Sequence, residues 1–232
     1  MSPPEYQTPE QSQCPSLLVY VLNIFSKAII AQFGGESGIS IKAAEPAGVL
    51  VAQIFAIPEH QFNGHSLIDI LLAKLHYSCP VLWGVYGDES TPGGRLRLGW
   101  RREDGAFVSE SRHHERVSGL GAGFASIALR NFAKSRLRNP FPPTNFWECL
   151  ATILNVPPHD VQPTHLFVLK AMLENSVERF IQFYGSAAIA ALRQALVKFP
   201  ATLPPKLQDT ASCKAITLLV DMLAREKNLR IE

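Results

Sequence analysis

Cysteine is scarce in this sequence, and the four cysteines lie far apart. Cys14, Cys79, Cys149 and Cys213 are separated by 65, 70 and 64 residues. No pair therefore has the spacing of a zinc knuckle or of a redox CxxC motif. We expect reduced and buried thiols, as is usual for proteins of the nucleus and cytoplasm.

A secretory leader and a long uninterrupted hydrophobic run are also missing. The first five residues are polar and proline-rich. The longest nearly apolar run, 17–33, contains Asn23, Ser26, Lys27 and Gln32. We interpret it as too short and too polar to cross a bilayer, and we expect no signal peptide and no membrane insertion.

The chain has little net charge. Its 232 residues are 47% hydrophobic and 18% charged with a net charge of +2, which is typical of a globular protein and excludes a strongly basic nucleic-acid binder. The charge is unevenly placed, however. Residues 95–138 hold ten basic and four acidic residues, a net +6, so the remainder carries −4. This pattern predicts one local anionic partner rather than a long nucleic-acid track.

No segment alternates with a period of two over several strands, whereas apolar residues recur with helical spacing. The sequence therefore predicts an all-α fold of stacked antiparallel helix pairs, a HEAT-like solenoid. We expect a flexible leader at 1–14 and a single domain at 15–232. Helices are expected at 16–33, 43–56, 66–78, 112–132, 144–154, 163–184, 186–199 and 208–228.

Two local details accompany this prediction. Ser66 and Asp69 have the spacing of a capping box at the start of the third helix. The glycine-rich segment 81–110 is expected to be a long loop with an extended piece at 96–100. A loop of this length in a compact domain usually has a function.

Two motifs could suggest an enzyme or a metal site. His113-His114-Glu115 could bind a metal, but adjacent helical residues point about 100° apart, so a solvated helix start is favoured. The glycine-rich run 119–123 resembles a phosphate-binding loop, yet no strand precedes it, so close helix packing is favoured. No GxSxG nucleophile motif is present. We expect no catalytic activity.

The arginine cluster is a better candidate for function. Arg95, Arg97, Arg101 and Arg102 lie within eight residues, next to Gly99 and Trp100. Converging guanidiniums repel one another unless an anion lies between them, and the forked guanidinium suits phosphate. A solvated basic loop explains the same residues, and the residues alone leave both interpretations open. Taken alone, Lys27 and Lys74 are each interpreted as ordinary solvated lysines.

Five separated motifs resemble the C-terminal domain of the GLFG-lethal mRNA export mediator family. They are GHSLIDILLAK (64–74) followed by Cys79-Pro80, GRLRLGWRR (94–102), HLFVL (165–169), AEPAGVL (44–50) and FIQFYG (180–185). The resemblance covers the chain from about residue 15 to the end. It implies a HEAT-like all-α domain, similar to the middle domain of the translation-initiation scaffold.

The resemblance also implies a function. Family members act in mRNA export at the cytoplasmic face of the nuclear pore complex, where this domain activates a DEAD-box RNA helicase. Inositol hexakisphosphate tethers the two proteins, and the domain also binds the C-terminal segment of an FG nucleoporin. The family protein has an additional N-terminal region with a coiled coil, so this chain is expected to be a fragment.

The family's ligand positions match residues of this sequence. The resemblance implies that Lys27, Lys74, Arg101 and Arg102 bind inositol hexakisphosphate, with Arg97 as a fifth. Further basic residues precede the Cys-Pro in the family, whereas here Tyr77 and Ser78 occupy those positions. Two other functions are weighed beside this one: a HEAT-like module that binds RNA directly, and an enzyme of phosphoinositide metabolism.

Overall fold

The computed structural model describes residues 13–231, and these are mostly helical, which confirms the all-α prediction. Two antiparallel pairs of two-residue strands are the described strand elements. The first half contains α1 (Ser16–Gly34), α2 (Glu36–Ile39), η2 (Ile41–Ala43), α3 (Ala44–Ala56), η3 (Pro58–His60), β1 (Gln61–Phe62), β2 (His65–Ser66), α4 (Asp69–Ser78), η4 (Pro80–Trp83), α5 (Pro92–Arg97), β3 (Arg102–Glu103), β4 (Ala106–Phe107) and α6 (Glu110–Ala128).

The regular elements of the second half, as far as residue 231, are helices. It contains α7 (Thr144–Leu154), α8 (Pro163–Glu174), α9 (Val177–Tyr184), α10 (Ser186–Arg193), the π-helical turn η5 (Gln194–Lys198), α11 (Phe199–Thr202), α12 (Pro205–Gln208) and α13 (Ala211–Glu226). The predicted leader at 1–14 lies, apart from its last two residues, outside the described part of the chain. The single domain and the HEAT-like stacking remain predictions.

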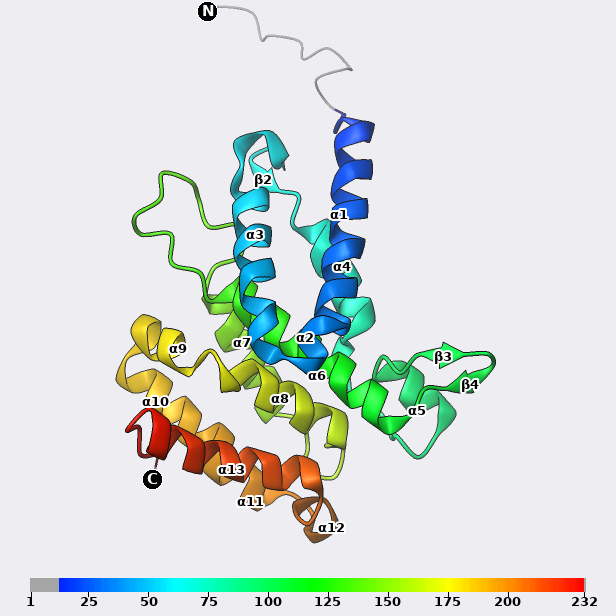
Figure 1. The fold of residues 1–232 in the computed structure, drawn as a ribbon, viewed down its shortest axis with the longest axis vertical. Coiled ribbons are helices and arrows are strands. Elements are labelled where there is room, and N and C mark those ends of the chain that lie inside the picture. The colour runs from blue at the N-terminus through cyan, green and yellow to red at the C-terminus, as the bar shows by residue number, and fades with distance from the viewer. Residues whose placement is uncertain (1–12, 232) are drawn as a thin grey trace, which may run out of the picture.

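Helix α6 is the centre of the fold. It packs against α1, α2 and α3 on one side and against α8 on the other (Figure 1). Its glycines permit these close approaches. A Cβ at Gly121 would lie 3.0 Å from the Val168 carbonyl oxygen, and one at Gly123 would lie 2.5 Å from the Phe33 ring. The close-packing interpretation of residues 119–123 is thus confirmed.

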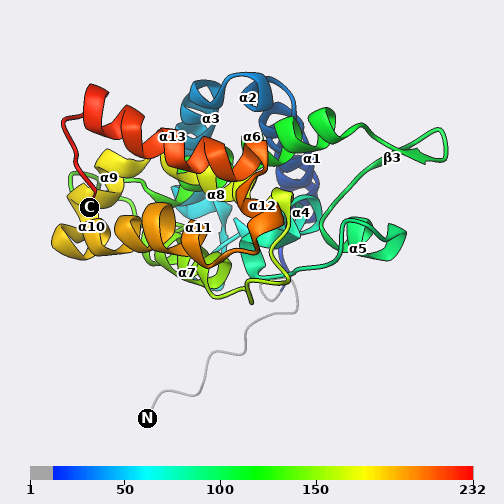
Figure 2. The same cartoon turned by 90° about the horizontal axis from the view of Figure 1, so that it is seen from below.

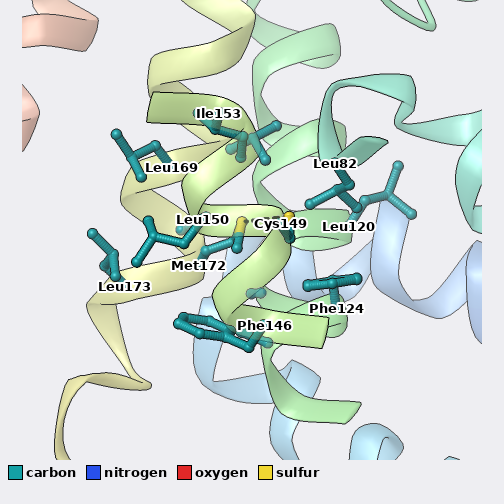
Figure 3. Packing of buried hydrophobic residues seen from close by; sticks show 14 of the residues in the cluster. Leu82, Leu120, Phe124, Phe146, Cys149, Leu150, Ile153, Leu169, Met172 and Leu173 are labelled. Carbon is teal, nitrogen blue, oxygen red and sulfur yellow. Dashed lines mark hydrogen bonds between the residues drawn. The ribbon is translucent and has the colours of Figure 1, made fainter. Parts of the chain in front are cut away.

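The core continues from α6 into α7 and α8. Phe146, Leu150 and Ile153 of α7 belong to the same buried cluster as Leu169 and Met172 of α8, and Figure 3 shows these side chains packed around α7. Cys149 contacts Met172 through its sulfur at 3.8 Å. Helix α13 packs on α8, and α10, α11 and α12 lie at the same end of the molecule (Figure 1 and Figure 2).

All four cysteines are free, as predicted. Cys79, Cys149 and Cys213 are buried, whereas Cys14 is only half-buried. Burial raises the pKa of the Cys79 thiol to about 12, so this thiol stays neutral at physiological pH.

Two of the predicted helices are interrupted. The expected helix 163–184 divides into α8 and α9 at Asn175-Ser176. Ser176 turns its hydroxyl back to the Met172 carbonyl, a bond that competes with helical hydrogen bonding. The expected helix 186–199 continues to Thr202 through η5. Pro200 explains the wide turn, because proline lacks an N–H and collides with the carbonyl four residues earlier.

Segment 81–110 is not the long loop that we predicted. It contains part of η4, then α5, whose first turn is capped by the Thr91 hydroxyl, and then the β3–β4 hairpin. The extended piece predicted at 96–100 is wrong, since α5 runs to Arg97 and the strands begin at Arg102. The hairpin projects from the side of the molecule (Figure 1).

The predicted cap of the third helix is also wrong. Ser66 belongs to β2, and its hydroxyl donates to the Phe55 carbonyl and accepts from the Ile68 N–H. Helix α4 begins later, at Asp69, without a side-chain cap. The Ser66 hydroxyl, which the sequence pattern assigned to the N-terminus of the third helix, therefore bonds to α3 instead.

Helix α1 has 19 residues and is apolar enough, by length and composition, to cross a membrane. Our argument that this run is too short and too polar therefore does not hold. Leu22, Ile29, Ile30 and Phe33 of α1 are buried in this fold, although only 28% of the apolar window of this helix is buried. The absence of membrane insertion remains a prediction.

Candidate anion-binding site

A hollow of about 720 Å³ lies where the end of α4 meets the segment between α5 and β3. Arg101, Arg102 and Arg116 line it together with His76 and the polar side chains of Tyr77 and Ser78. Among the residues that the structure describes, no carboxylate lines it. The hollow is therefore a concave and positively charged surface.

Gly99 brings the arginine-bearing segment against the end of α4. It has a left-handed φ of 80°, which favours glycine. A Cβ at this position would lie 2.8 Å from the Ser78 carbonyl oxygen and 2.9 Å from Pro80 Cδ. Only glycine permits this approach, and the approach forms one wall of the hollow.

Trp100 anchors the same segment in the core. Its ring is buried and stacks on His113, with ring centroids 4.1 Å apart and an interplanar angle of 14°. The Arg95 guanidinium lies over the Trp100 ring at 4.7 Å, and its Nε donates to the Glu89 carbonyl at 2.7 Å. The Arg95 side chain is thus held by contacts within the protein, whereas Arg101 and Arg102, which follow Trp100 in the chain, are exposed.

A buried polar network holds this region to α8. His113 Nε2 lies 2.9 Å from Thr164 Oγ1, and the Glu89 carboxylate accepts from both the Thr164 N–H and its hydroxyl. Burial lowers the pKa of His113 to about 3 and raises the pKa of Glu89. The solvated helix start predicted for residues 113–115 is wrong for His113, whose imidazole is a neutral core group.

Arg116 was not predicted as a site residue. Its side chain is 7% exposed, and its Nη1 donates to the Gly99 carbonyl at 3.0 Å. Burial, and then the neighbouring Arg101, lower its pKa to about 10, so it remains a cation. The sequence does carry a signal for it. Arg116 lies three residues after His113 and four before Leu120, on the buried face of α6.

The structure brings together only part of the predicted ligand set. Arg101 and Arg102 line the hollow. Lys27 on α1 is exposed, Lys74 on α4 is half-buried and Arg97 at the end of α5 is exposed, and none of the three lines the hollow. Helices α1 and α4 pack against each other, so the two lysines belong to neighbouring elements.

A second hollow of about 720 Å³ lies between η2, α6, α8 and α13, and its charge differs. Its Lys170 donates to Glu174 at 2.7 Å, and Glu115 is also in its lining. These acidic groups offset its positive charge. Within residues 13–231 no three His, Cys, Asp or Glu side chains are grouped closely enough to hold a metal ion. The arginine-lined hollow is therefore the candidate site.

Comparisons with known proteins agree on one family. The sequence model described as GLE1-like protein matches residues 4–196. The mRNA export factor GLE1 of Chaetomium thermophilum is 48% identical over 227 residues, which cover 98% of this chain and 42% of that protein. The Saccharomyces cerevisiae mRNA export factor GLE1 is 27% identical over 174 residues, covering 73% of this chain and 31% of that protein. This chain thus spans less than half the length of these relatives.

The fold is similar to that of a solved structure as well. A Gle1 chain in a complex of the S. cerevisiae Dbp5 C-terminal domain with Gle1 and IP6 matches with a TM-score of 0.77. The match covers 91% of this chain and 70% of that chain, at 22% identity. The sequence match over most of the chain and the shared fold show that the chain belongs to the GLE1-like protein family.

Proposed function

We propose that this chain is the helicase-activating domain of an mRNA export factor. It binds a DEAD-box RNA helicase of the Dbp5 kind at the cytoplasmic face of the nuclear pore, and inositol hexakisphosphate joins the two proteins. The observation that carries the proposal is the hollow lined by Arg101, Arg102 and Arg116 without a carboxylate. A Gle1 of similar fold is bound to Dbp5 and IP6 in its own structure, which supports this assignment.

The chemistry of the hollow suits a small, highly charged ligand. Inositol hexakisphosphate carries many negative charges on one ring and needs cations from several chain segments. Arg101 and Arg102 come from the segment before and within β3, and Arg116 comes from α6. Each charge-assisted hydrogen bond contributes about 1.5–3 kcal/mol. Three or four such bonds give a Kd of roughly micromolar after the entropic cost of binding.

The proposed ligand set also keeps Lys27, Lys74 and Arg97. Because these residues lie outside the hollow lining, they contribute where the ligand or the helicase extends beyond it. Tyr77 and Ser78 line the hollow and replace cations of the family pattern. A hydroxyl donates a hydrogen bond to phosphate but supplies no charge, so these two positions hold the ligand more weakly than lysine or arginine would.

The proposed mechanism acts on the helicase, and the domain itself carries out no chemical step. A DEAD-box helicase closes two lobes on ATP and RNA. A rigid helical scaffold that touches both lobes favours an open arrangement, and it shifts that equilibrium only by its different affinities for the two states. Faster opening releases RNA and nucleotide sooner and raises ATP turnover.

The test is steady-state ATPase of the helicase at subsaturating RNA, with and without this chain, across inositol hexakisphosphate concentrations. We expect stimulation that rises with the inositol phosphate. The double variant Arg101→Gln/Arg102→Gln should need at least about tenfold more ligand for the same rate, because two charge-assisted contacts are lost. Arg193→Gln on α10, an exposed arginine outside the hollow, is the matched control. Unchanged ligand dependence in the double variant would refute the proposed site.

The same domain is proposed to bind the C-terminal segment of an FG nucleoporin. The C-terminal helices leave Ile189, Val197 and Leu218 exposed, and Leu218 on α13 is 64% exposed. An apolar peptide would cover such side chains and so stabilise the fold. We expect the peptide to raise the melting temperature, and Leu218→Ser to reduce that rise. A peptide that leaves the melting temperature unchanged would contradict this role.

Direct RNA binding is the alternative that an electrophoretic shift assay decides. The three arginines converge on one hollow, where Tyr77 is a strongly exposed aromatic side chain, and they do not form the extended track of cations and stacking aromatic side chains that single-stranded RNA binders use. We expect no shift of bare RNA at the concentrations that activate the helicase. A salt-sensitive shift that Arg101→Gln/Arg102→Gln abolishes would replace the proposal with RNA binding.

A further inference from the structure

We infer that Arg116 is a phosphate-binding residue at the base of the hollow, where it receives one phosphate group of a compact polyphosphate. This inference deepens the proposed function and rests on it. Family resemblance pointed to residues 27, 74, 97, 101 and 102 and left Arg116 out. The structure supplies three observations for it beside its place in the lining of the hollow: a buried charge without a described counter-ion, a further cation close by, and a side chain held in place before any ligand arrives.

The first observation is that Arg116 is a buried charge without a counter-ion. It is 7% exposed, yet none of the salt bridges formed within residues 13–231 includes it. Its Nη1 donates to the uncharged Gly99 carbonyl, and its Nε has no hydrogen-bond partner. A buried guanidinium is costly unless an anion is paired with it, so this arrangement is suited to an anion that arrives from outside.

The second observation is that no neighbouring group can neutralise Arg116. The Cys79 thiol and the Tyr77 phenol are the nearby groups of opposite potential charge, and neither is a carboxylate. The pKa of the Cys79 thiol, about 12, keeps that thiol uncharged. The Arg101 guanidinium is close enough to lower the pKa of Arg116, so the local charge is doubly positive. Two cations facing one space are stabilised together by a single phosphate between them.

The third observation is that Arg116 is held in place before any ligand arrives. The stem of its side chain packs beneath Gly34 at the end of α1, where an added Cβ would lie 3.2 Å from Arg116 Cγ. The Nη1 bond to Gly99 fixes the plane of the guanidinium. Little side-chain entropy is therefore lost on binding, in contrast to the exposed Arg101 and Arg102.

The position of Arg116 also defines the kind of ligand. A buried cation that lines a hollow is reached by a group that enters the hollow, whereas a polymer lying across the surface meets the exposed Arg101 and Arg102 first. A compact ring that bears several phosphates can place one phosphate at Arg116 and others at the two exposed arginines. Single-stranded RNA carries one phosphate per nucleotide along an extended chain and fits this arrangement less well.

The test is isothermal titration of the purified chain with inositol hexakisphosphate, using wild type, Arg116→Met, Arg116→Lys, Arg101→Gln/Arg102→Gln and the control Arg193→Gln. Methionine keeps an apolar stem beneath Gly34 and removes the charge. We expect Arg116→Met to weaken binding by about 10- to 100-fold, the value of one charge-assisted contact. Arg116→Lys should fall in between, since it keeps the charge but loses the fork. Arg193→Gln should bind like wild type.

Each outcome separates the inference from the proposed function. If Arg101→Gln/Arg102→Gln loses affinity while Arg116→Met and Arg116→Lys bind like wild type, the inference is overturned and the proposed function stands. If the wild-type chain binds no inositol hexakisphosphate, both fail. If bare RNA competes with the ligand in an Arg116-dependent manner, the ligand class is wrong.

A structural role for Arg116 would give a different pattern. Melting curves followed by circular dichroism would then show Arg116→Met unfolding at a clearly lower temperature, with affinity falling only by the unfolded fraction. Where Arg116→Met does not fold, Arg116→Lys carries the test, because it retains the stem and the charge. In wild type, the NMR signal of the Arg116 Nε–H should shift on titration, and an unchanged signal at saturation would overturn the inference.

Discussion

Replacing Gly123 by alanine is predicted to destabilise the fold, although helix propensity predicts the opposite. Gly123 lies inside α6, where alanine is favoured over glycine by about 1 kcal/mol. The new Cβ, however, would lie 2.5, 2.5 and 2.7 Å from three ring atoms of Phe33, where ordinary contacts are 3.4–4 Å. Phe33 is fully buried, so its ring has no free space into which to move.

The two effects have different sizes, and packing should win. Overpacking a well-packed core costs about 1–3 kcal/mol, and an overlap of this depth belongs at the upper end. After the gain in helix propensity, we expect a net loss of about 2 kcal/mol in the free energy of unfolding. For a chain of this size that loss lowers the melting temperature by about 4–8 °C. Differential scanning calorimetry measures the shift.

A control and a double variant make the test specific. Gly93 lies in α5 with open space around it, so Gly93→Ala should be neutral or slightly stabilising. Phe33→Ala removes the three overlapping ring atoms, so the cost of Gly123→Ala should shrink in that background, as a double-mutant cycle would show. The reasoning is refuted if Gly123→Ala melts at or above the wild-type temperature, or if the two costs simply add.

Two further predictions concern the network that anchors the site. Burial lowers the pKa of His113 from 6.5 to about 3, so between these pH values the unfolded chain binds a proton that the folded chain does not. The stability of the fold therefore falls as the pH falls through this window. His113→Gln should make the melting temperature less dependent on pH in the same window, and an unchanged slope would contradict this prediction. Glu89→Ala removes the acceptor for the Thr164 N–H and hydroxyl and should cost about 1–2 kcal/mol in urea unfolding, whereas Glu59→Ala, at an exposed position, should cost nothing measurable.

The sequence predicted well those helices in which the helical spacing of apolar residues ends where helix-breaking residues occur. Helix α7 has the predicted bounds, because prolines precede it and its buried residues recur at helical spacing. The helices that were predicted wrongly have a local conflict. Asn175-Ser176 and Pro200 interrupt a continuous apolar pattern, and the pattern alone does not register a hydroxyl bonded to the backbone or a missing N–H.

The candidate site shows the same division. Composition and spacing showed a cluster of four arginines that includes Arg101 and Arg102, and the family resemblance selected these two as ligand residues. Arg116 is fourteen residues after Arg102 and approaches the cluster only because Gly99 meets α4 and α6 crosses the molecule. Arg95 and Arg97 looked equivalent to Arg101 in the sequence, yet Arg95 is bound to Trp100 and Glu89.

By itself the sequence determined the helical class, the positions of most helices, the close-packed role of the glycine-rich run and a local excess of positive charge. These depend on periodicity, residue size and charge, which neighbouring residues along the chain already specify. Only the tertiary structure decided which arginines line the hollow, that His113 is buried and neutral, and that Arg116 has no counter-ion among residues 13–231. Burial and pairing depend on groups far apart in the chain, and folding alone brings those groups together.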